Sequence, residues 1–445
     1  MSRKIHIISI TNLSCIAVLY MISFFVLPFT GMSQTFDIAS LYSKKTLQIE
    51  RAKQQQGLYK YSLIPLLTMQ PDSTNEYSFE SGLGAISQFM IKNDTTKKIV
   101  DKLVVNYPIL SNSTKRALLE VIYGLYKNDY DAPLMAFWRT EENIKLWAML
   151  SLILQKNKET FYKSDDDRAI FIRRITDTAH PILTELQKYN DYAYRPKKPI
   201  SDLGGLFANQ RHIGTKIIYS LQRHNRDYPG LAIIQNEDGS FVKDANGHVK
   251  TFVQLARSAS NLPYFMTDGS TPQGIFRIDS TAISNNLAIG PTPNIQLRMP
   301  NEIVGDSFFI RLNQPILNDT VFLEEYNKLL PKSWRNVEMQ QSFFAGKCGR
   351  SEIIAHGTTI DPSFYKQDLF YPNTPTMGCL CAKENWDAKT GKLLQSDQLD
   401  MVNAFLSTPG ASGYLFVINV DDQQLPMSKM EVEKWVRDYE IKAKK

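Results

Sequence analysis

The sequence predicts an α+β protein in which an N-terminal all-α region precedes a β-rich region and a C-terminal helix. Three observations support this fold class. Apolar residues recur at three- and four-residue spacing in the first half of the chain, short apolar runs separated by turn sequences fill the second half, and a helix-capping sequence stands near the end. With 445 residues, the chain is long enough for two or three domains.

The composition is that of a folded protein without a nucleic-acid partner. Hydrophobic residues make up 43% of the chain and charged residues 22%, which are ordinary values for a globular protein. The formal net charge of +6 is small and dispersed, so it does not predict binding to nucleic acid.

Residues 1–33 are expected to be a targeting segment. Arg3 and Lys4 give it a positive start, and Cys15 to Pro28 is an uncharged apolar run. Small residues follow, which makes Gln34 the expected first residue of a cleaved chain. A signal peptide and an uncleaved membrane anchor both fit this pattern. In either case we expect the protein to be exported.

Residues 36–200 are expected to form a helical region. Apolar residues from Leu118 to Leu125, and again from Ile144 to Ile153, recur at helical spacing. The aspartates at 165–167 favour a helix start, because acidic side chains stabilise that end of a helix. A metal site is the alternative, but no histidine or calcium-loop glycine accompanies them. Prolines and cations from Tyr194 to Pro199 predict a linker.

Residues 201–228 are expected to connect this region to the next, with a short helix-like passage from Thr215 to Gln222. Residues 229–421 are then expected to be β-rich, with strong turn signals at Asp238-Gly239 and Asn246-Gly247. The expected strands are Leu231–Ile234, Phe252–Leu255, Gly274–Ile278, Ile295–Leu297, Phe308–Leu312, Glu352–Ala355 and Tyr414–Val420.

Residues 422–445 are expected to close the chain with a helix. Ser428 and Glu431 have the spacing of a capping box, in which each side chain bonds the backbone of the other residue. The apolar residues that follow lie on one side of the predicted helix, so it is expected to pack against the rest of the protein.

Two short motifs carry the predicted chemistry. Ala355-His356-Gly357-Thr358 places an imidazole beside a glycine, and Thr376-Met377-Gly378-Cys379 places a thiol beside another. A thiol becomes a strong nucleophile when a base takes its proton, and histidine is the usual base. Glycines let the backbone run close to a substrate and turn N–H groups toward a developing oxyanion. The two motifs together predict a cysteine acyl-transfer enzyme.

The cysteine count supports a reactive thiol in an exported chain. Cleavage of the leader would leave Cys348, Cys379 and Cys381, an odd number. Cys379 and Cys381 are separated by one residue, which gives poor geometry for a disulfide between them. A Cys348–Cys381 bridge that leaves Cys379 free stays open.

In order and residue type, these motifs resemble the L,D-transpeptidase catalytic domain, a β-sandwich-like fold that remodels bacterial peptidoglycan. The family pattern is a His-Gly pair, a variable loop and then Ser/Thr-x-Gly-Cys. A second patch agrees with it, because Thr271-Pro272-Gln273-Gly274 and the nearby Phe276 resemble a segment that precedes the active-site strands of the family. The resemblance covers residues 229–421, under half of the chain.

The resemblance implies roles for the motif residues. Cys379 would be the nucleophile and His356 the general base. The backbone carbonyl of Gly357 would orient the imidazole. N–H groups of Met377 and Gly378, together with that of Cys379, would form the oxyanion hole.

Substrate contacts are less clearly implied. Many family members carry a histidine where this chain has Met377, and an arginine or asparagine where it has Cys381. We therefore expect Arg350 to bind the substrate carboxylate in place of the missing polar group; a surface cation is the alternative. The expected substrate contacts are Arg350, Thr358, Thr376 and Tyr371.

The insert between the two motifs, residues 359–375, is rich in aromatic residues and proline. It is expected to be either a lid over the acyl site or a packed surface loop. Its position between both catalytic candidates favours the lid.

The predicted function is that of an exported L,D-transpeptidase, periplasmic or anchored in the membrane and facing the periplasm. Peptidoglycan stem peptides would be donor and acceptor, and no motif predicts a metal or another cofactor. A related thiol hydrolase (an L,D-carboxypeptidase or amidase) and a non-catalytic wall-binding scaffold are the alternatives. Papain-like peptidases and sortases fit less well, because their Cys–His order or spacing differs. The helical region could bind a protein partner.

Overall fold

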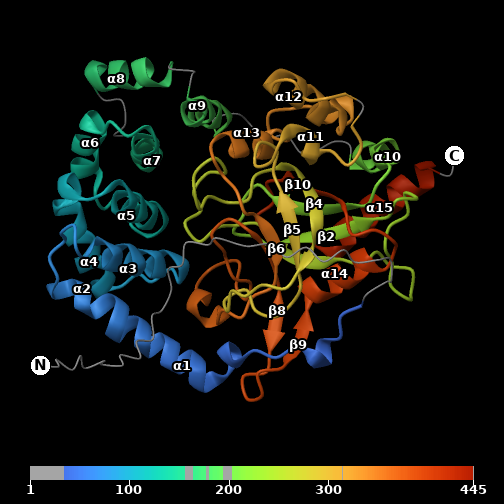
Figure 1. Cartoon of the computed structure of the whole chain (residues 1–445), viewed down its shortest axis with the longest axis horizontal. Coiled ribbons are helices and arrows are strands. Elements are labelled where there is room, and N and C mark those ends of the chain that lie inside the picture. Colours follow the sequence, from blue (N-terminus) through green and yellow to red (C-terminus); the bar gives the residue numbers. More distant parts are fainter. Residues whose placement is uncertain (1–34, 156–163, 177–179, 194–202, 313, 444–445) are drawn as a thin grey trace, which may run out of the picture.

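The computed structural model describes residues 35–155, 164–176, 180–193, 203–312 and 314–443. These residues combine helices and strands, so the prediction of a mixed fold is confirmed. An arc of helices, α2 to α9, borders one side of a β-barrel, and further helices cover other faces of the barrel (Figure 1). The predicted leader at 1–33 and linker at 194–199 lie outside the described residues. The domain boundaries stay predictions.

The helices of the N-terminal half are α1 (Gln48–Gly57), α2 (Ile64–Thr68), α3 (Glu76–Gln88), α4 (Asp94–Val105), α5 (Asn112–Leu125), α6 (Asp131–Thr140), α7 (Ile144–Gln155), α8 (Asp165–Ile175) and α9 (Pro181–Ala193). Those of the second half are α10 (Leu203–Ile213), α11 (Gly305–Phe308), α12 (Asp319–Lys328), α13 (Gln341–Lys347), α14 (Asp397–Leu406) and α15 (Lys429–Ala443). A π-helix (η3, Leu58–Leu63) joins α1 to α2, and the short 3₁₀ helices are η1 (Ile38–Ser40), η2 (Lys44–Thr46), η4 (Tyr107–Ile109), η5 (Lys332–Trp334) and η6 (Pro362–Tyr365).

The helices of the N-terminal half share one apolar core. Helix α5 begins after Ser111, whose side chain accepts a hydrogen bond from the Thr114 N–H, and the helix buries Leu118 and Ile122. Helix α7 is buried along Leu146–Leu154, as expected for a central helix that is apolar on all sides. None of the helices in the described ranges is both long and apolar enough to pass through a membrane.

The strands are β1 (Ile217–Arg223), β2 (Gly230–Gln235), β3 (Phe252–Leu255), β4 (Gly274–Ala282), β5 (Asn294–Arg298), β6 (Ile354–His356), β7 (Leu380–Ala382), β8 (Glu384–Trp386), β9 (Leu393–Ser396) and β10 (Gly413–Asp421). Eight of these described strands close into a barrel in the order β1-β10-β4-β5-β6-β7-β3-β2, while β8 and β9 form a separate pair. Pairs β1–β10 and β6–β7 are parallel, and the other neighbours in the barrel are antiparallel.

The interior of the barrel is filled by apolar side chains. Every strand of the barrel contributes to one buried cluster, for example Ile218 of β1, Ala355 of β6 and Leu380 of β7. Met401 and Phe405 of α14 belong to the same cluster. A barrel of eight strands is just narrow enough for side chains to fill it. The architecture is therefore a closed barrel, where the resemblance implied a sandwich-like fold.

Helices α10, α12, α13 and α15 cover the outer faces of β1, β2, β4 and β10 in a second apolar cluster. The predicted capping box at the start of α15 is confirmed. The Ser428 N–H donates to the Glu431 carboxylate at 2.9 Å, and the Glu431 N–H donates to Ser428 Oγ at 3.3 Å. Arg223 at the end of β1 forms an ion pair with Glu431 at 2.9 Å, which ties the helix to the barrel.

Two sequence predictions are wrong in this region. Residues 215–222 do not form a helix, because Ile217–Arg223 is strand β1, buried at every position between two neighbouring strands. Residues 308–312 do not form a strand. Helix α11 ends at Phe308, whose ring meets those of Phe309 and Phe322 at centroid distances of 5.3 and 5.9 Å, so an aromatic cluster explains the apolar run.

Residues 36–47, here called the N-terminal strap, lie against the barrel side of the molecule. The Phe36 N–H donates to Asn403 Oδ1 of α14 at 2.8 Å, and the Asn403 side chain donates back to the Phe36 carbonyl at 2.9 Å. Tyr42 forms a β-bridge with Lys392 next to β9. Helix α1 then leads from the strap to the arc of helices (Figure 1).

Two loops of the barrel half touch the arc of helices. In the first, residues 256–273, Leu262, Phe265 and Met266 are buried in the core of the helical half. In the second, the insert at 359–375, the Tyr365 hydroxyl donates to the Gln88 carbonyl of α3 at 2.7 Å. The helices therefore support the loops that surround the two predicted catalytic motifs.

Candidate active site

Strands β6 and β7 carry the two catalytic candidates. They run in parallel, with Ala355 opposite Leu380 and His356 opposite Cys381. Cys379 directly precedes β7, and the N–H of Ile354 in β6 points at its Sγ at 3.5 Å. Since Ala355 and Leu380 fill the barrel interior, the alternation of side chains along a strand puts His356 and Cys379 on the outer face. The predicted base and nucleophile thus share one face of two adjacent strands.

The imidazole of His356 is held by its neighbouring peptide. Its Nδ1 lies 2.5 Å from the Gly357 carbonyl oxygen. A carbonyl only accepts, so Nδ1 carries the proton and Nε2 keeps a free lone pair that can accept one. Burial lowers the pKa of His356 below its ordinary value of 6.5, which keeps the ring neutral at neutral pH. The orienting role that was predicted for the Gly357 carbonyl requires this contact.

The thiol of Cys379 is neutral in this environment. The residue is half-buried, and its Sγ donates to the Glu352 carbonyl at 3.7 Å. Burial raises the pKa of the Cys379 thiol to about 11, although the Ile354 N–H and the positive charge of Arg350 act in the opposite direction. A neutral thiol on the same face as a neutral imidazole requires a base-assisted attack rather than a preformed thiolate.

The loop before the cysteine is fixed by Thr376. Its Oγ1 accepts from the Gly378 N–H at 3.0 Å and donates to the Cys379 carbonyl at 2.8 Å. The predicted oxyanion donor of Gly378 is therefore engaged here with a side chain. The N–H groups of Met377 and Cys379 have no hydrogen-bond partner within the described part of the chain, so they are the donors free to meet an oxyanion.

Gly378 also connects the two sequence patches of the predicted family pattern. The Thr271 hydroxyl donates to the Gly378 carbonyl at 2.9 Å. Gly378 has a φ of +116°, a conformation that favours glycine, and a Cβ there would lie 2.7 Å from the Gly269 carbonyl oxygen. The 271–274 patch and the 376–379 motif are thus parts of one structure.

Arg350 lies beside this loop but serves the backbone. One terminal nitrogen of its guanidinium donates to the carbonyls of Tyr264 at 2.7 Å and Ser270 at 3.0 Å. The residue is buried, and burial lowers the pKa of its guanidinium to about 10. Its described contacts hold the 256–273 loop in place. The prediction that it binds a substrate carboxylate stays untested.

A half-buried carboxylate next to the histidine motif was not predicted. Glu384 of β8 accepts a hydrogen bond from the Thr358 N–H at 2.8 Å and another from Ser396 Oγ at 2.6 Å. Trp386, two residues along the same strand, donates from its ring nitrogen to the Thr358 carbonyl at 2.9 Å. Burial raises the pKa of Glu384 to about 7. Strand β8 is too short for its alternation to have been recognised in the sequence.

These contacts also define Thr358, one of the predicted substrate contacts. Its backbone N–H and carbonyl are both engaged by β8, and its side chain is buried. Among the other predicted contacts, Thr376 shapes the loop before Cys379, and Tyr371 is 44% exposed on the insert. The side chain of Tyr371 is therefore the most accessible of the four.

The insert at 359–375 is anchored by its aromatic residues. Tyr365 and Phe370 are fully buried and pack with Leu255 of β3. Phe364 stacks obliquely on Phe89 with ring centroids 4.6 Å apart. Of the two alternatives, these contacts favour a packed loop over a lid.

The three described cysteines are free, so the Cys348–Cys381 bridge is not formed in this structure. Cys348 packs against the core of the helical half, and Cys381 contacts Thr374 Oγ1 at 3.4 Å. Burial raises the pKa of both thiols to about 12. Cys381 is opposite His356 in the strand pairing but is buried, whereas Cys379 is half-buried and directly follows the glycine of the 376–379 motif.

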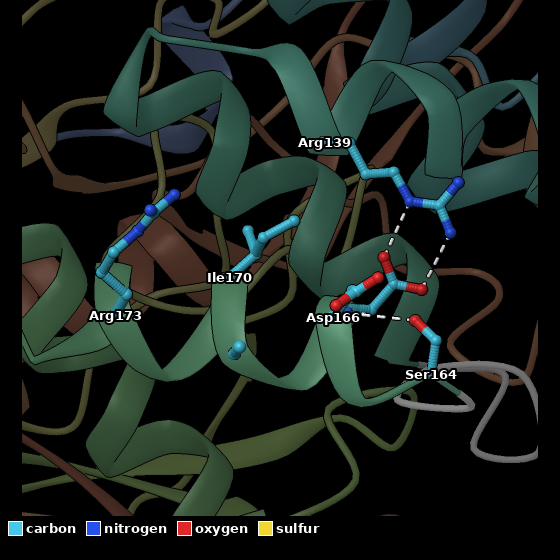
Figure 2. Close-up of a pocket in the computed structure, with 7 residues that line it drawn as sticks. Arg139, Ser164, Asp166, Ile170 and Arg173 are labelled. Atoms are coloured by element: carbon cyan, nitrogen blue, oxygen red, sulfur yellow. Dashed lines mark hydrogen bonds and ion pairs between the residues drawn. The ribbon is translucent and has the colours of Figure 1, made fainter.

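A surface pocket in the helical half is separate from these motifs (Figure 2). It is lined by Arg139 of α6 and by residues at and within α8. Arg139 pairs with Asp167 at 2.7 Å, and Ser164 caps the helix that the aspartates at 165–167 begin, as predicted. Within the described residues no group of histidine, cysteine and acidic side chains has the arrangement of a metal site.

The chain was compared with protein-family models, curated proteins and solved structures, and none matches it. The family implied by the motifs therefore stays a prediction.

Proposed function

We propose that the protein is an exported cysteine L,D-transpeptidase that acts on peptidoglycan stem peptides. The observation that carries this proposal is the hydrogen bond between His356 Nδ1 and the Gly357 carbonyl, at the end of β6, which is adjacent to β7; Cys379 directly precedes β7. This bond leaves Nε2 as a base on the face that also presents the thiol. The N–H groups of Met377 and Cys379, which have no hydrogen-bond partner within the described residues, would donate to the oxyanion.

The proposed reaction has two steps. In the first, His356 Nε2 takes the thiol proton while Sγ attacks the carbonyl of the bond between the third and fourth residues of a stem peptide. The carbon–nitrogen bond breaks, the imidazolium returns its proton to the departing D-amino acid, and a thioester remains. In the second, the amine of a neighbouring stem attacks the thioester, its proton passes to His356, and the thiol is regenerated.

The location and partners belong to the same proposal. Peptidoglycan lies outside the cytoplasmic membrane, so the enzyme would work in the periplasm, either released from its leader or anchored by residues 1–33. The helical half would position the site loops and could also bind a protein partner.

Purified protein should convert tetrapeptide muropeptides to cross-linked products with release of the terminal D-amino acid, as measured by mass spectrometry. Cys379→Ala and His356→Ala should each abolish this turnover. Cys348→Ala, which removes a cysteine outside the site, should retain it. Wild-type turnover by Cys379→Ala would contradict the proposal.

The products distinguish the alternatives. Tripeptides without cross-links, in the presence of acceptor stems, would identify a thiol hydrolase and overturn the transpeptidase assignment. Binding of peptidoglycan without turnover would favour a scaffold. A carbapenem that adds covalently to Cys379 in the wild type but not in His356→Ala would support activation of the thiol by the imidazole.

A further inference from the structure

The peptide unit between Gly357 and Thr358 is hydrogen-bonded at both ends. Its carbonyl oxygen accepts from His356 Nδ1 at 2.5 Å, and its N–H donates to the Glu384 carboxylate at 2.8 Å. One peptide group therefore stands between the imidazole and a half-buried carboxylate. The carboxylate itself does not touch the ring in the described hydrogen bonds, so the contact is relayed by the backbone.

A peptide group transmits charge along this direction. Its carbonyl and its N–H are coupled by resonance, and a negative charge that accepts from the N–H makes the carbonyl oxygen a stronger acceptor. A stronger acceptor holds the Nδ1 proton more firmly and stabilises the imidazolium that forms when Nε2 takes a proton. The same reasoning explains a carboxylate that bonds histidine directly in other catalytic triads.

We propose that Glu384 is a positioning residue that holds and polarises the Gly357–Thr358 peptide and thereby orients His356 as the base for Cys379. This inference rests on the proposed function for its catalytic consequence. The juxtaposition of carboxylate, peptide and imidazole is independent of the substrate.

A steric observation at Gly357 and a second hydrogen bond from β8 also support the arrangement. A Cβ on Gly357 would lie 2.2 Å from the carboxyl carbon of Glu384, so the glycine provides the space that the carboxylate occupies. Trp386 holds the Thr358 carbonyl from the same strand. Both polar groups of the Thr358 backbone are therefore hydrogen-bonded by residues of β8.

The surroundings of Glu384 favour an acceptor at this place. Ser396, which donates to the carboxylate, is also the N-cap of α14 and accepts from the Leu399 N–H at 2.9 Å. The N-terminal end of a helix carries partial positive charge, which stabilises a carboxylate beside it. Thr358 and Ser396 both donate, as a carboxylate requires.

Glu384→Gln is the direct test, because glutamine keeps the size and one acceptor oxygen but removes the charge. We expect kcat for muropeptide turnover to fall about tenfold, the effect of weakening one charge-assisted hydrogen bond. In the wild type, turnover should decline as Glu384 takes up a proton below about pH 7, and this part of the acid limb should be absent from Glu384→Gln. The His356 Nδ1–H proton resonance should move upfield.

Asp397→Asn is the matched control. Asp397 lies in the first turn of α14, near Glu384 in the sequence, but its carboxylate is no partner of the Gly357–Thr358 peptide within the described part of the chain. This variant should keep the wild-type resonance and pH profile. A shift of equal size in both variants would indicate a general change of charge and overturn the relay.

If Glu384→Gln does not fold, the wild-type protein can be titrated with labelled glutamate, and the Nδ1–H resonance should follow the ionisation of Glu384. A resonance that stays constant through that ionisation would contradict the inference. If the resonance responds but the wild type does not turn over muropeptides, the proposed function fails while the positioning role stands.

Discussion

At the scale of single residues, the candidate pair is neutral before a substrate arrives. Burial raises the pKa of the Cys379 thiol to about 11 and lowers the pKa of the His356 imidazole. Both shifts disfavour a resting thiolate–imidazolium pair. The proton transfer is therefore coupled to the attack on the substrate. Until a substrate binds, the neutral thiol is less easily oxidised than a thiolate would be.

The pH dependence follows from these directions. Only neutral His356 can accept the thiol proton, and its pKa lies below 6.5, so the acid limb of kcat/KM should fall below pH 6.5. In His356→Ala, alkylation of Cys379 by iodoacetamide should increase steadily toward pH 11. Mass spectrometry of samples quenched at successive times measures the rate of alkylation. An alkylation profile that levels off near neutral pH in the variant would contradict a raised thiol pKa.

The motif residues could be predicted because their chemistry is local in sequence. His356-Gly357 and Gly378-Cys379 are each adjacent pairs, and the structure brings the two pairs onto neighbouring strands. Glu384 could not be predicted in the same way. Its partner Thr358 is 26 positions earlier, and a lone glutamate in a polar segment has no distinguishing pattern.

At the scale of elements, the turn before β7 combines backbone strain with close packing. Gly378→Ala should destabilise the protein by about 1–3 kcal/mol for its left-handed conformation alone. The new methyl group would also meet the Arg350 guanidinium at 2.3 Å. We expect turnover to be lost, because the turn must shift to make room. Thermal unfolding and muropeptide turnover measure the two effects.

Gly247→Ala provides the control for strain without crowding. Gly247 has a φ of +84°, and nothing lies within 4 Å of the position of its Cβ. It should lower the unfolding temperature modestly and leave turnover unchanged. Equal loss of turnover in both variants would mean that the crowding at Gly378 has no special effect.

Strand prediction succeeded where apolar residues alternate between clear turns. Strands β2, β3, β4, β5 and β10 occur where they were expected, and the boundaries of β3 agree at both ends. Strand β1 was missed, because burial on both faces removes the alternation that marks a strand. The apolar run at 308–312 was mistaken for a strand, since aromatic packing around a short helix leaves the same signature in sequence.

At the scale of the whole molecule, the helical half and the barrel share a core. Phe265 is 1% exposed, belongs to a loop of the barrel half, and packs edge-on against Tyr189 of α9 with ring centroids 5.9 Å apart. The closed barrel and this shared core could not be predicted, because both depend on pairings between residues far apart in the chain. Local patterns carry no information about such pairings.

Phe265→Ala tests the shared core. Loss of a fully buried phenylalanine should cost about 3–5 kcal/mol. Because its cavity lies between the two halves, the helices and the barrel should both lose stability and unfold in one calorimetric transition. Two separate transitions in the wild type, with only one of them shifted in the variant, would show that the halves are energetically independent.

The N-terminal strap has a consequence for the order of folding. Its first bond joins Phe36 to Asn403, residues 367 positions apart, and β1 cannot complete its pairing until β10 is available. The first described segment of the chain is thus among the last to dock. Contacts across so long a separation form slowly, since loop closure must precede them. The helical half can collapse early through local contacts. One side of its core would then stay exposed to solvent until the barrel has folded.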